Sequence, residues 1–369
     1  QALNHQAAIA IEAVYPNNPD YAGALLEHWH TAGNMDKEAH YLYMVVSRSL
    51  DTTGVNPRTY HILERTLSAL ADSDERRTPL LNLRAKAYFF GGQFDQAGDF
   101  ASQAHTLAQQ NNDQAQLAES LSTLGNVASR RGDLAQAEIH LRDTITIWEK
   151  LDNPLGIARN TSTIGMLYYR QGNADDAQIY FEKAHAIYRT IGDKLGMATT
   201  LNYFGYVCVA RNDYEGAKQY YLQSLPLMKE VGDQRGIALL LGNIGWILNT
   251  QGQPQEAIGY YQQSLELAKQ TGNKHLVTVQ LQELGNSYCA LGNYEKGMAY
   301  MEDCLAMRRT IGDTIGIAYV LNVLAMSHYR QGNYEKALAC GEECLQIGKE
   351  AGEKNMIIGG LNNLGNTYA

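Results

Sequence analysis

Apolar residues recur along the chain with helical spacing, and the pattern repeats every 40 residues. Between residues 196 and 208, Leu201, Phe204 and Cys208 follow the i, i+3, i+7 spacing of one helical face. Residues 211–214 form a polar turn, and apolar positions from Ala217 to Leu227 mark a second helix. Each 40-residue unit therefore predicts two helices joined by a turn.

Glycines keep the same period, since 21 of the 34 fall on four registers spaced by 40 residues or a multiple of 40. The first register lies in mid-helix, where glycine costs ~1 kcal/mol relative to alanine. It predicts that a neighbouring helix backbone passes close by. The second register contains Gly-Asn and Gly-Asp pairs at 132, 172, 292 and 332, which predict a helix end with positive φ followed by an N-cap. The members of the first register are Gly125, Gly165, Gly205, Gly245, Gly285 and Gly365, with Ala85 and Ala325 in the vacant places.

The repeats resemble those of the tetratricopeptide family. One repeat carries the family pattern as Leu281, Leu284, Gly285, Tyr288, Gly297, Met301 and Cys304, and another as Thr161, Ile164, Gly165, Tyr168, Ala177, Phe181 and Ala184. The 40-residue length, in place of 34, resembles the repeats of kinesin light chains and of the sensor arms of bacterial STAND-type regulators (signal-transduction ATPases with numerous domains). The resemblance implies an all-α fold, a superhelical solenoid of antiparallel helix pairs.

The repeat pattern divides the chain in two. Residues 78–369 hold seven repeats followed by one unpaired first helix from Ile358. Residues 1–77 lack the glycine series and read as degenerate helical hairpins, with a helix over 57–71 and a charged break over 72–77. This front segment resembles the stretch that joins the ATPase core to the repeat arm in STAND regulators. The resemblance implies an N-terminal cap or a junction to a further domain. Because the chain begins at Gln1 rather than Met, we also expect it to be a fragment of a longer protein.

Charge and composition narrow the range of partners. The net charge of −9 disfavours direct contact with nucleic acid, which calls for clustered Lys and Arg. No apolar run approaches the roughly 20 residues that span a bilayer. Five cysteines without a C-x-x-C pair favour a reducing compartment. We therefore expect a cytoplasmic protein that does not enter the membrane.

The sequence offers little catalytic chemistry. It contains no phosphate-binding loop, no dinucleotide-binding glycine motif, no H-E-x-x-H and no G-x-S-x-G. His28 and His30 point to different sides of a helix, and Cys344 falls on a small-residue packing position. We therefore expect no enzyme activity, no cofactor and no metal site.

The resemblance places the binding surface of a repeat solenoid on the concave face lined by the first helices. Asn side chains there offer both a donor and an acceptor and can hold the backbone of an extended peptide. Aromatic and Met side chains supply apolar pockets, and Arg side chains favour carboxylates. The candidate residues on this face are Asn82, Asn126, Arg130, Met166, Tyr169, Arg170, Asn202, Tyr203, Tyr206, Asn243, Trp246, Asn249, Asn286, Asn322, Met326 and Arg330.

These features predict a protein-interaction module that binds a peptide or protein segment in its groove, within a larger signalling regulator or adaptor. A first alternative is the small-molecule-sensing arm of a STAND-type regulator, which the front segment suggests. A second alternative is a structural scaffold that self-associates through the unpaired C-terminal helix.

Overall fold

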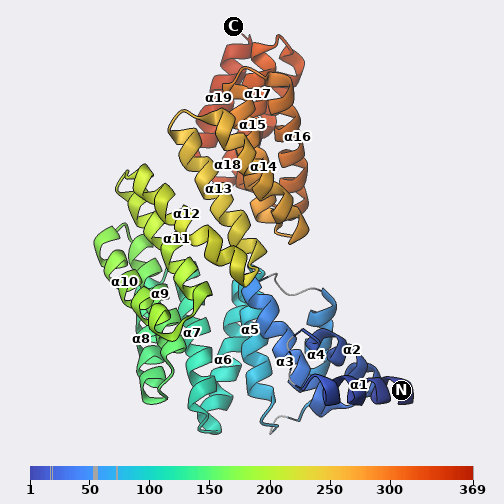
Figure 1. Ribbon diagram of the computed structural model, residues 1–369. Helices are drawn as coiled ribbons and strands as arrows, with labels where there is room; N and C mark the ends of the chain where they lie inside the picture. The colour runs from blue at the N-terminus through green and yellow to red at the C-terminus, as the bar shows by residue number, and fades with distance from the viewer. Residues whose placement is uncertain (17, 19, 53–56, 72–73, 369) are drawn as a thin grey trace. The chain divides into compact units, whose positions relative to one another are not determined.

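The computed structural model describes residues 1–16, 18, 20–52, 57–71 and 74–368 (Figure 1). These residues form 19 helices and no strand. The chain divides into two compact units, unit 1 over residues 1–233 and unit 2 over residues 234–369. Unit 1 contains α1 (Ala2–Val14), α2 (Ala22–Ala32), α3 (Met35–Thr52), α4 (Pro57–Ala69), α5 (Arg77–Phe90), α6 (Phe94–Gln110), α7 (Gln114–Arg131), α8 (Leu134–Lys150), α9 (Pro154–Arg170), α10 (Ala174–Ile191), α11 (Lys194–Ala210) and α12 (Tyr214–Val231). Unit 2 contains α13 (Gln234–Thr250), α14 (Pro254–Gln270), α15 (Lys274–Ala290), α16 (Tyr294–Ile311), α17 (Thr314–Arg330), α18 (Tyr334–Ala351) and α19 (Lys354–Tyr368).

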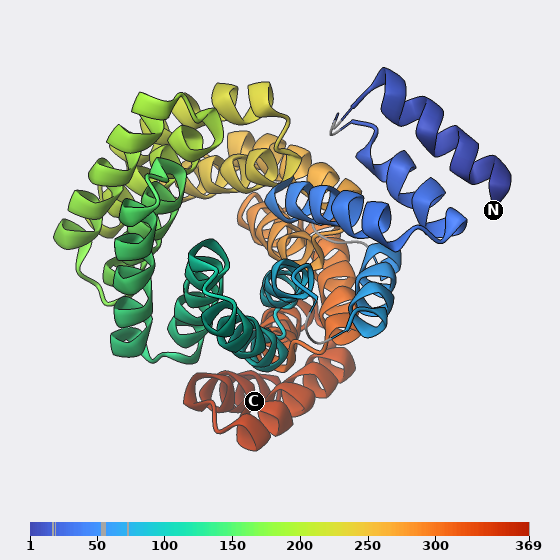
Figure 2. The same cartoon turned by 90° about the horizontal axis from the view of Figure 1, so that it is seen from below.

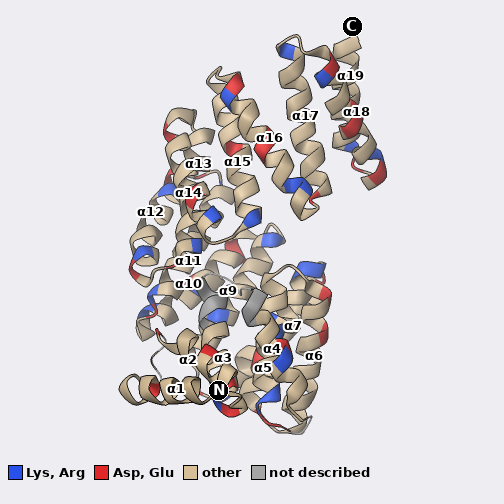
Figure 3. Ribbon diagram, turned by 90° about the vertical axis from the view of Figure 1, so that its right-hand side faces the viewer, with Lys and Arg blue, Asp and Glu red and all other residues tan. Residues whose placement is uncertain are grey.

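The predicted helix pairs are confirmed. From α5 onwards, each odd-numbered helix up to α17 packs against the even-numbered helix that follows it, which gives seven pairs. Within unit 1, α7 to α12 follow one another along a curve (Figure 2). Within unit 2 the helices form successive layers up to α19 (Figure 3). The last helix begins at Lys354, before the predicted Ile358, and packs against α18 and α17.

The turns follow the glycine prediction. Every glycine of the second register, which also includes Gly92 and Gly252, has a φ between 77° and 86°. Asn212 takes the vacant place with a φ of 60°. Asp133, Asn173 and Asn293 then accept a backbone N–H as N-caps. Asn333 occupies the same position without a capping bond, and its Nδ2 donates to Gln331 Oε1 at 3.3 Å.

The mid-helix glycines make room for a side chain of the partner helix. At Gly285 the predicted close approach of that helix's backbone is also present, since the Gly297 carbonyl oxygen would lie 3.1 Å from an added methyl group. A methyl group on Gly165 would lie 2.6 Å from the ring of Phe181, and one on Gly205 would lie 2.1 Å from the ring of Tyr221. Both rings come from the second helix of the same repeat and are almost fully buried. The glycine is therefore a notch into which the partner helix inserts a large residue.

The front segment shares a core with the first repeat. Trp29, Tyr41 and Leu63 from α2, α3 and α4 pack in one buried cluster with Leu81 of α5 and Ala104 of α6. The helix predicted to reach residue 71 ends at Ala69, and positions 72 and 73 of the predicted charged break lie outside the described residues. The division at residue 77 stays a prediction drawn from the repeat pattern.

Candidate functional site

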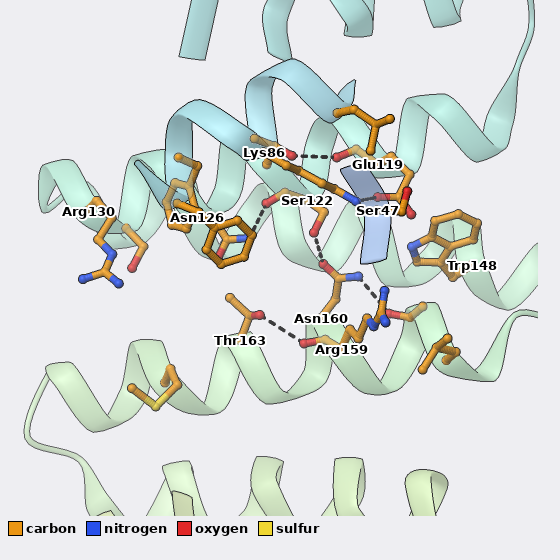
Figure 4. A pocket seen from close by; sticks show the side chains of 18 of the residues that line it. Ser47, Lys86, Glu119, Ser122, Asn126, Arg130, Trp148, Arg159, Asn160 and Thr163 are labelled. Carbon is orange, nitrogen blue, oxygen red and sulfur yellow. Dashed lines mark hydrogen bonds and ion pairs between the residues drawn. The ribbon is translucent and has the colours of Figure 1, made fainter. Parts of the chain in front are cut away.

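One pocket of unit 1 lies against the first helices of three successive repeats, α5, α7 and α9 (Figure 4). Its volume is about 540 Å³. In each of these repeats the residue after the central glycine or alanine lines the pocket, as Lys86, Asn126 and Met166. The pocket therefore lies on the first-helix face to which the sequence assigns its candidate residues.

A hydrogen-bond network forms the middle of the pocket. Ser122 Oγ donates to Asn160 Oδ1 at 2.8 Å, which links α7 to α9. Asn160 Nδ2 donates to the carbonyl of Gly156 at 2.8 Å, and Asn126 Nδ2 donates to the carbonyl of Ser122 at 2.9 Å. Each amide thus donates a hydrogen bond to a carbonyl of its own helix, which fixes the orientation of the side chain (Figure 4). The carboxamide oxygen of Asn126 accepts none of these bonds and is available as an acceptor.

The pocket is rich in positive charge. It is lined by Lys86, Arg130, Arg159 and Arg170 and by one acidic residue, Glu119, which forms an ion pair with Lys86. Arg130 lies 5.8 Å from the centre of the Phe89 ring, and Arg170 Nη1 donates to Ser129 Oγ at 3.0 Å. Burial and the neighbouring Arg130 charge both lower the pKa of Arg170. The pocket therefore favours an anionic ligand in a chain whose net charge is −9.

Apolar side chains complete the lining. Trp148 of α8 reaches the pocket although only 5% of its surface is exposed. Its place depends on Gly156, where a methyl group would lie 2.6 Å from the indole ring. Phe89, Met166 and Tyr203 contribute further apolar surface. This combination of fixed polar groups and aromatic rings is typical of ligand sites.

The structure brings some of the unit 1 candidates together and separates others. Tyr169 and Tyr206 stack on each other with ring centres 5.9 Å apart and do not line the pocket. Asn82 and Asn202 are buried, and Asn82 Nδ2 donates to the Gln116 carbonyl at 3.0 Å, so that it holds α5 to α7. The candidates that line the pocket are Asn126, Arg130, Met166, Arg170 and Tyr203.

The unit 2 candidates form their own set on α13, α15 and α17. Trp246 and Met326 are 39% and 43% exposed. Asn322 Oδ1 accepts a hydrogen bond from Asn363 at 2.8 Å, which ties α17 to α19. A binding role for this set stays a prediction. Its remaining members are Asn243, Asn249, Asn286 and Arg330.

Sequence reasoning missed several residues of the pocket. Lys86 occupies the same repeat position as Asn126 and Met166, so the register contained a signal for it. Arg159 lies about two helical turns before Met166 on α9, so extending the repeat register by two turns would have identified it. Tyr43 and Ser47 come from α3, and no repeat position points to them.

Two further properties concern the described residues alone. None of their helices is both long enough and apolar enough to cross a membrane. Nor do their His, Cys, Asp and Glu side chains form a group of three that could hold a metal ion.

Solved structures with the same fold include three informative proteins. BtubC (BKLC) from P. vanneervenii has a TM-score of 0.52 at 20% identity, covering 59% of this chain and 92% of that one. A STAND protein with a tetratricopeptide repeat sensor from Pyrococcus horikoshii has a TM-score of 0.65 at 18% identity, covering 85% of this chain and 50% of that one. The Rap conjugation gene regulator of the plasmid pLS20, in complex with the Phr* peptide, has a TM-score of 0.57 at 15% identity, covering 89% and 96%. At these identities the likeness concerns the fold.

The sequence comparisons give the family. No curated protein matches the chain significantly. The tetratricopeptide repeat family model matches residues 76–150, 156–230, 213–270 and 276–350, which together span well over half of the chain. These matches coincide with the helix pairs from α5 to α18. The chain therefore belongs to the tetratricopeptide repeat family.

Proposed function

We propose that this chain is a protein-interaction module and that the unit 1 pocket binds a peptide or protein segment. The observation that carries the proposal is the pocket itself, where fixed polar groups, aromatic rings and Arg side chains converge from three repeats. Asn126 and Lys86 offer hydrogen bonds to a backbone, while Met166 offers apolar contact to a side chain. The complex of the Rap regulator with the Phr* peptide supports the proposal, because it shows that a chain of this fold can bind a peptide.

The test is selection of peptides on the purified full chain from a displayed library of random heptapeptides. We expect enriched sequences to bind in calorimetry and Met166→Glu to weaken that binding about tenfold, because a charge would replace apolar contact surface. Ile139→Glu is the control, since Ile139 is 53% exposed on α8 and does not line the pocket. Failure to enrich any peptide, or equal losses in both variants, would contradict the proposal.

A small-molecule sensor is the second candidate. The volume of about 540 Å³ lies within the range of small-molecule sites, and the STAND sensor protein shares the fold over 85% of this chain. A metabolite library screened by thermal shift tests this candidate. We expect any hit to lose its effect in Met166→Glu and to keep it in Ile139→Glu.

A self-associating scaffold is the third candidate. Ile358 and Leu361 of α19 are 55% and 52% exposed, which leaves apolar surface uncovered on the last helix. Light scattering over a range of concentrations tests it, with Leu361→Glu as the variant. A mass equal to one chain at every concentration would remove this candidate.

A further inference from the structure

The positions that line the unit 1 pocket recur in unit 2 with a different chemistry. On α7 and on α9 the pocket is lined by residues at i, i+4 and i+7, beginning at Glu119 and Arg159. The 40-residue period transfers these positions to α13, α15 and α17, where they begin at Leu239, Val279 and Tyr319. We call the nine residues at these positions the unit 2 array. Because the equivalent positions face one pocket in unit 1, the array forms one surface on the first helices of unit 2.

The surface of the array is mainly apolar. Six of its nine residues are Leu, Val, Met, Trp or Tyr. Leu239, Trp246, Tyr319 and Met326 are each between 38% and 43% exposed. In unit 1 the equivalent positions on α7 and α9 hold a single apolar residue, Met166. Exposed apolar side chains gathered on one surface indicate a site of protein interaction.

Glu283 occupies the central position of the array and is its only charged residue. Among the residues that the structure describes, this half-buried carboxyl has no ion-pair partner, and Gln282 and Tyr261 are the side chains that act on its pKa. Burial raises that pKa, because no cation compensates for the loss of water. The carboxamide oxygen of Gln280, about one turn earlier on α15, is buried and accepts no hydrogen bond from the described residues. The centre of the array thus presents oxygen acceptors that lack a cation.

Arg308 brings a positive charge close to this part of α15 without pairing with Glu283. Its guanidinium group extends from α16, forms an ion pair with Asp313 at 2.6 Å and donates to Gln282 Oε1 at 2.8 Å. Arg308 is buried, so its side chain is held in place by the surrounding packing. The charge of Arg308 is therefore balanced by Asp313, and no described residue balances that of Glu283.

We propose that the unit 2 array binds an amphipathic helix of a partner protein, and that this helix presents one Lys or Arg to Glu283 from within its apolar face. The surface is separate from the unit 1 pocket, so the inference goes beyond the proposed function and does not depend on it. Charge complementarity identifies the partner, since a cation supplies what the centre of the array lacks.

The spacing of the array suits a helix. Its first and last positions on each element are seven residues apart, about 10 Å along the helix axis, and the same spacing separates i and i+7 on an incoming helix. Apolar side chains at i and i+7 of the partner therefore cover the outer rows of the array, and the residue between them reaches Glu283. A Lys or Arg at that place packs its methylene groups against apolar surface and brings its charge to the carboxylate.

The experiment uses three pools of N-acetylated, C-amidated peptides of about 16 residues that carry Lys, Gln or Glu at one central position. Apolar positions on the same helical face vary among Leu, Ile, Phe and Met, and the remaining positions are Ala, Ser and Gln. Each pool is captured on the purified full chain and quantified by mass spectrometry. We expect capture of the Lys pool to exceed that of the Gln pool about tenfold and the Glu pool to be captured least.

Matched variants locate the contact. Glu283→Gln should remove the preference for Lys, whereas Glu302→Gln, which changes an exposed carboxyl on α16, should keep it. Met326→Glu should weaken capture about tenfold, because a charge replaces apolar contact surface. Met166→Glu, at the equivalent position of the unit 1 pocket, should leave capture unchanged. Tyr319→Ser replaces Met326→Glu in the test if circular dichroism shows that Met326→Glu does not fold.

Three results overturn the proposal. One is absence of capture, or equal capture of the Lys, Gln and Glu pools. Another is a Lys preference that survives Glu283→Gln, or capture that Met166→Glu abolishes and Met326→Glu does not. The third is equal capture of a Lys pool with proline beside the central residue, since proline interrupts the helix. Each of these results leaves the function proposed for the unit 1 pocket standing, because the selection of heptapeptides tests that pocket separately.

Discussion

At the scale of single residues, the notch at each mid-helix glycine determines how the two helices of a repeat meet. Tyr261 of α14 is fully buried beside Gly245 of α13, where a methyl group would lie 2.8 Å from the ring. The 40-residue period identifies Gly245 as a position where the repeats prefer glycine. The insertion of a ring could not be predicted, because Leu, Phe, Tyr and Met all occupy the facing position in different repeats.

Gly245→Ala is expected to destabilise unit 2 although alanine is the better helix former. The clash with a buried ring costs about 1–3 kcal/mol, and the gain in helix propensity offsets only ~1 kcal/mol of it. Gly259→Ala on α14 is the control, since no atom lies within 4 Å of the added methyl group. It should stabilise by up to about 1 kcal/mol. Urea unfolding followed by circular dichroism distinguishes the two, and a loss of stability in Gly259→Ala would contradict this account.

Glu283 of α15 gives a pH-dependent prediction. Burial raises the pKa of its carboxyl, so the folded state favours the neutral acid more than the unfolded state does. The stability that this group contributes is present below its unfolded pKa and is lost as the pH rises through its folded pKa. Glu283→Gln should therefore raise the thermal midpoint at pH 7, and the difference should shrink toward pH 4. Glu302→Gln, on the exposed surface of α16, is the control. A Glu283→Gln midpoint below that of the wild type at pH 7 would contradict the prediction.

Asn82 and Asn322 show that residue type and repeat position do not suffice to predict contact with a ligand. Both occupy the position three before the central glycine or alanine, where the sequence predicts contact with a ligand. In the structure Asn82 donates a hydrogen bond to α7, and Asn322 accepts one from α19. An amide serves a ligand and a neighbouring helix equally well, so the residue type alone could not decide between the two.

At the scale of elements, glycines and capping residues mark the turns between the helices of the repeats. Two turns show what such signals leave open. Residues 292–296 and 332–336 have the same sequence, Gly-Asn-Tyr-Glu-Lys. Asn293 accepts the N–H of Lys296 as an N-cap, whereas Asn333 donates to Gln331 and makes no capping bond. The residue that precedes the shared sequence differs between the two turns, Leu291 in one and Gln331 in the other.

Alanine substitutions at these two caps should therefore differ in effect. Asn293→Ala removes a capping bond and should cost about 1 kcal/mol, the usual value for such a cap. Asn333→Ala removes only an exposed side-chain bond and should cost less than half as much. Both substitutions lie in unit 2, so the same urea unfolding experiment compares them. Equal losses would show that the capping geometry of the two turns is the same in solution.

At the scale of the whole molecule, the pocket includes residues that lie outside the part of the chain matched by the family model. The match begins at residue 76, yet α3 contributes Tyr43 and Ser47 to the pocket lining. The shared core explains how this arises, because α2, α3 and α4 are fixed against α5 through residues such as Tyr41 and Leu81. The repeat period could predict the first-helix face but not this contribution, since residues 1–77 carry no periodic signal that would align α3 with the repeats.

The front segment should therefore take part in binding. Tyr43 is 43% exposed and lines the pocket, so Tyr43→Ala should weaken binding of a selected heptapeptide severalfold in calorimetry while leaving the thermal midpoint nearly unchanged. Leu3→Ala is the control, because Leu3 of α1 is 79% exposed and does not line the pocket. Unchanged affinity in Tyr43→Ala would restrict the site to the repeats themselves. A loss confined to Tyr43→Ala would mean that the helices before the first repeat form part of the recognition surface, and that the repeats alone do not reproduce its specificity.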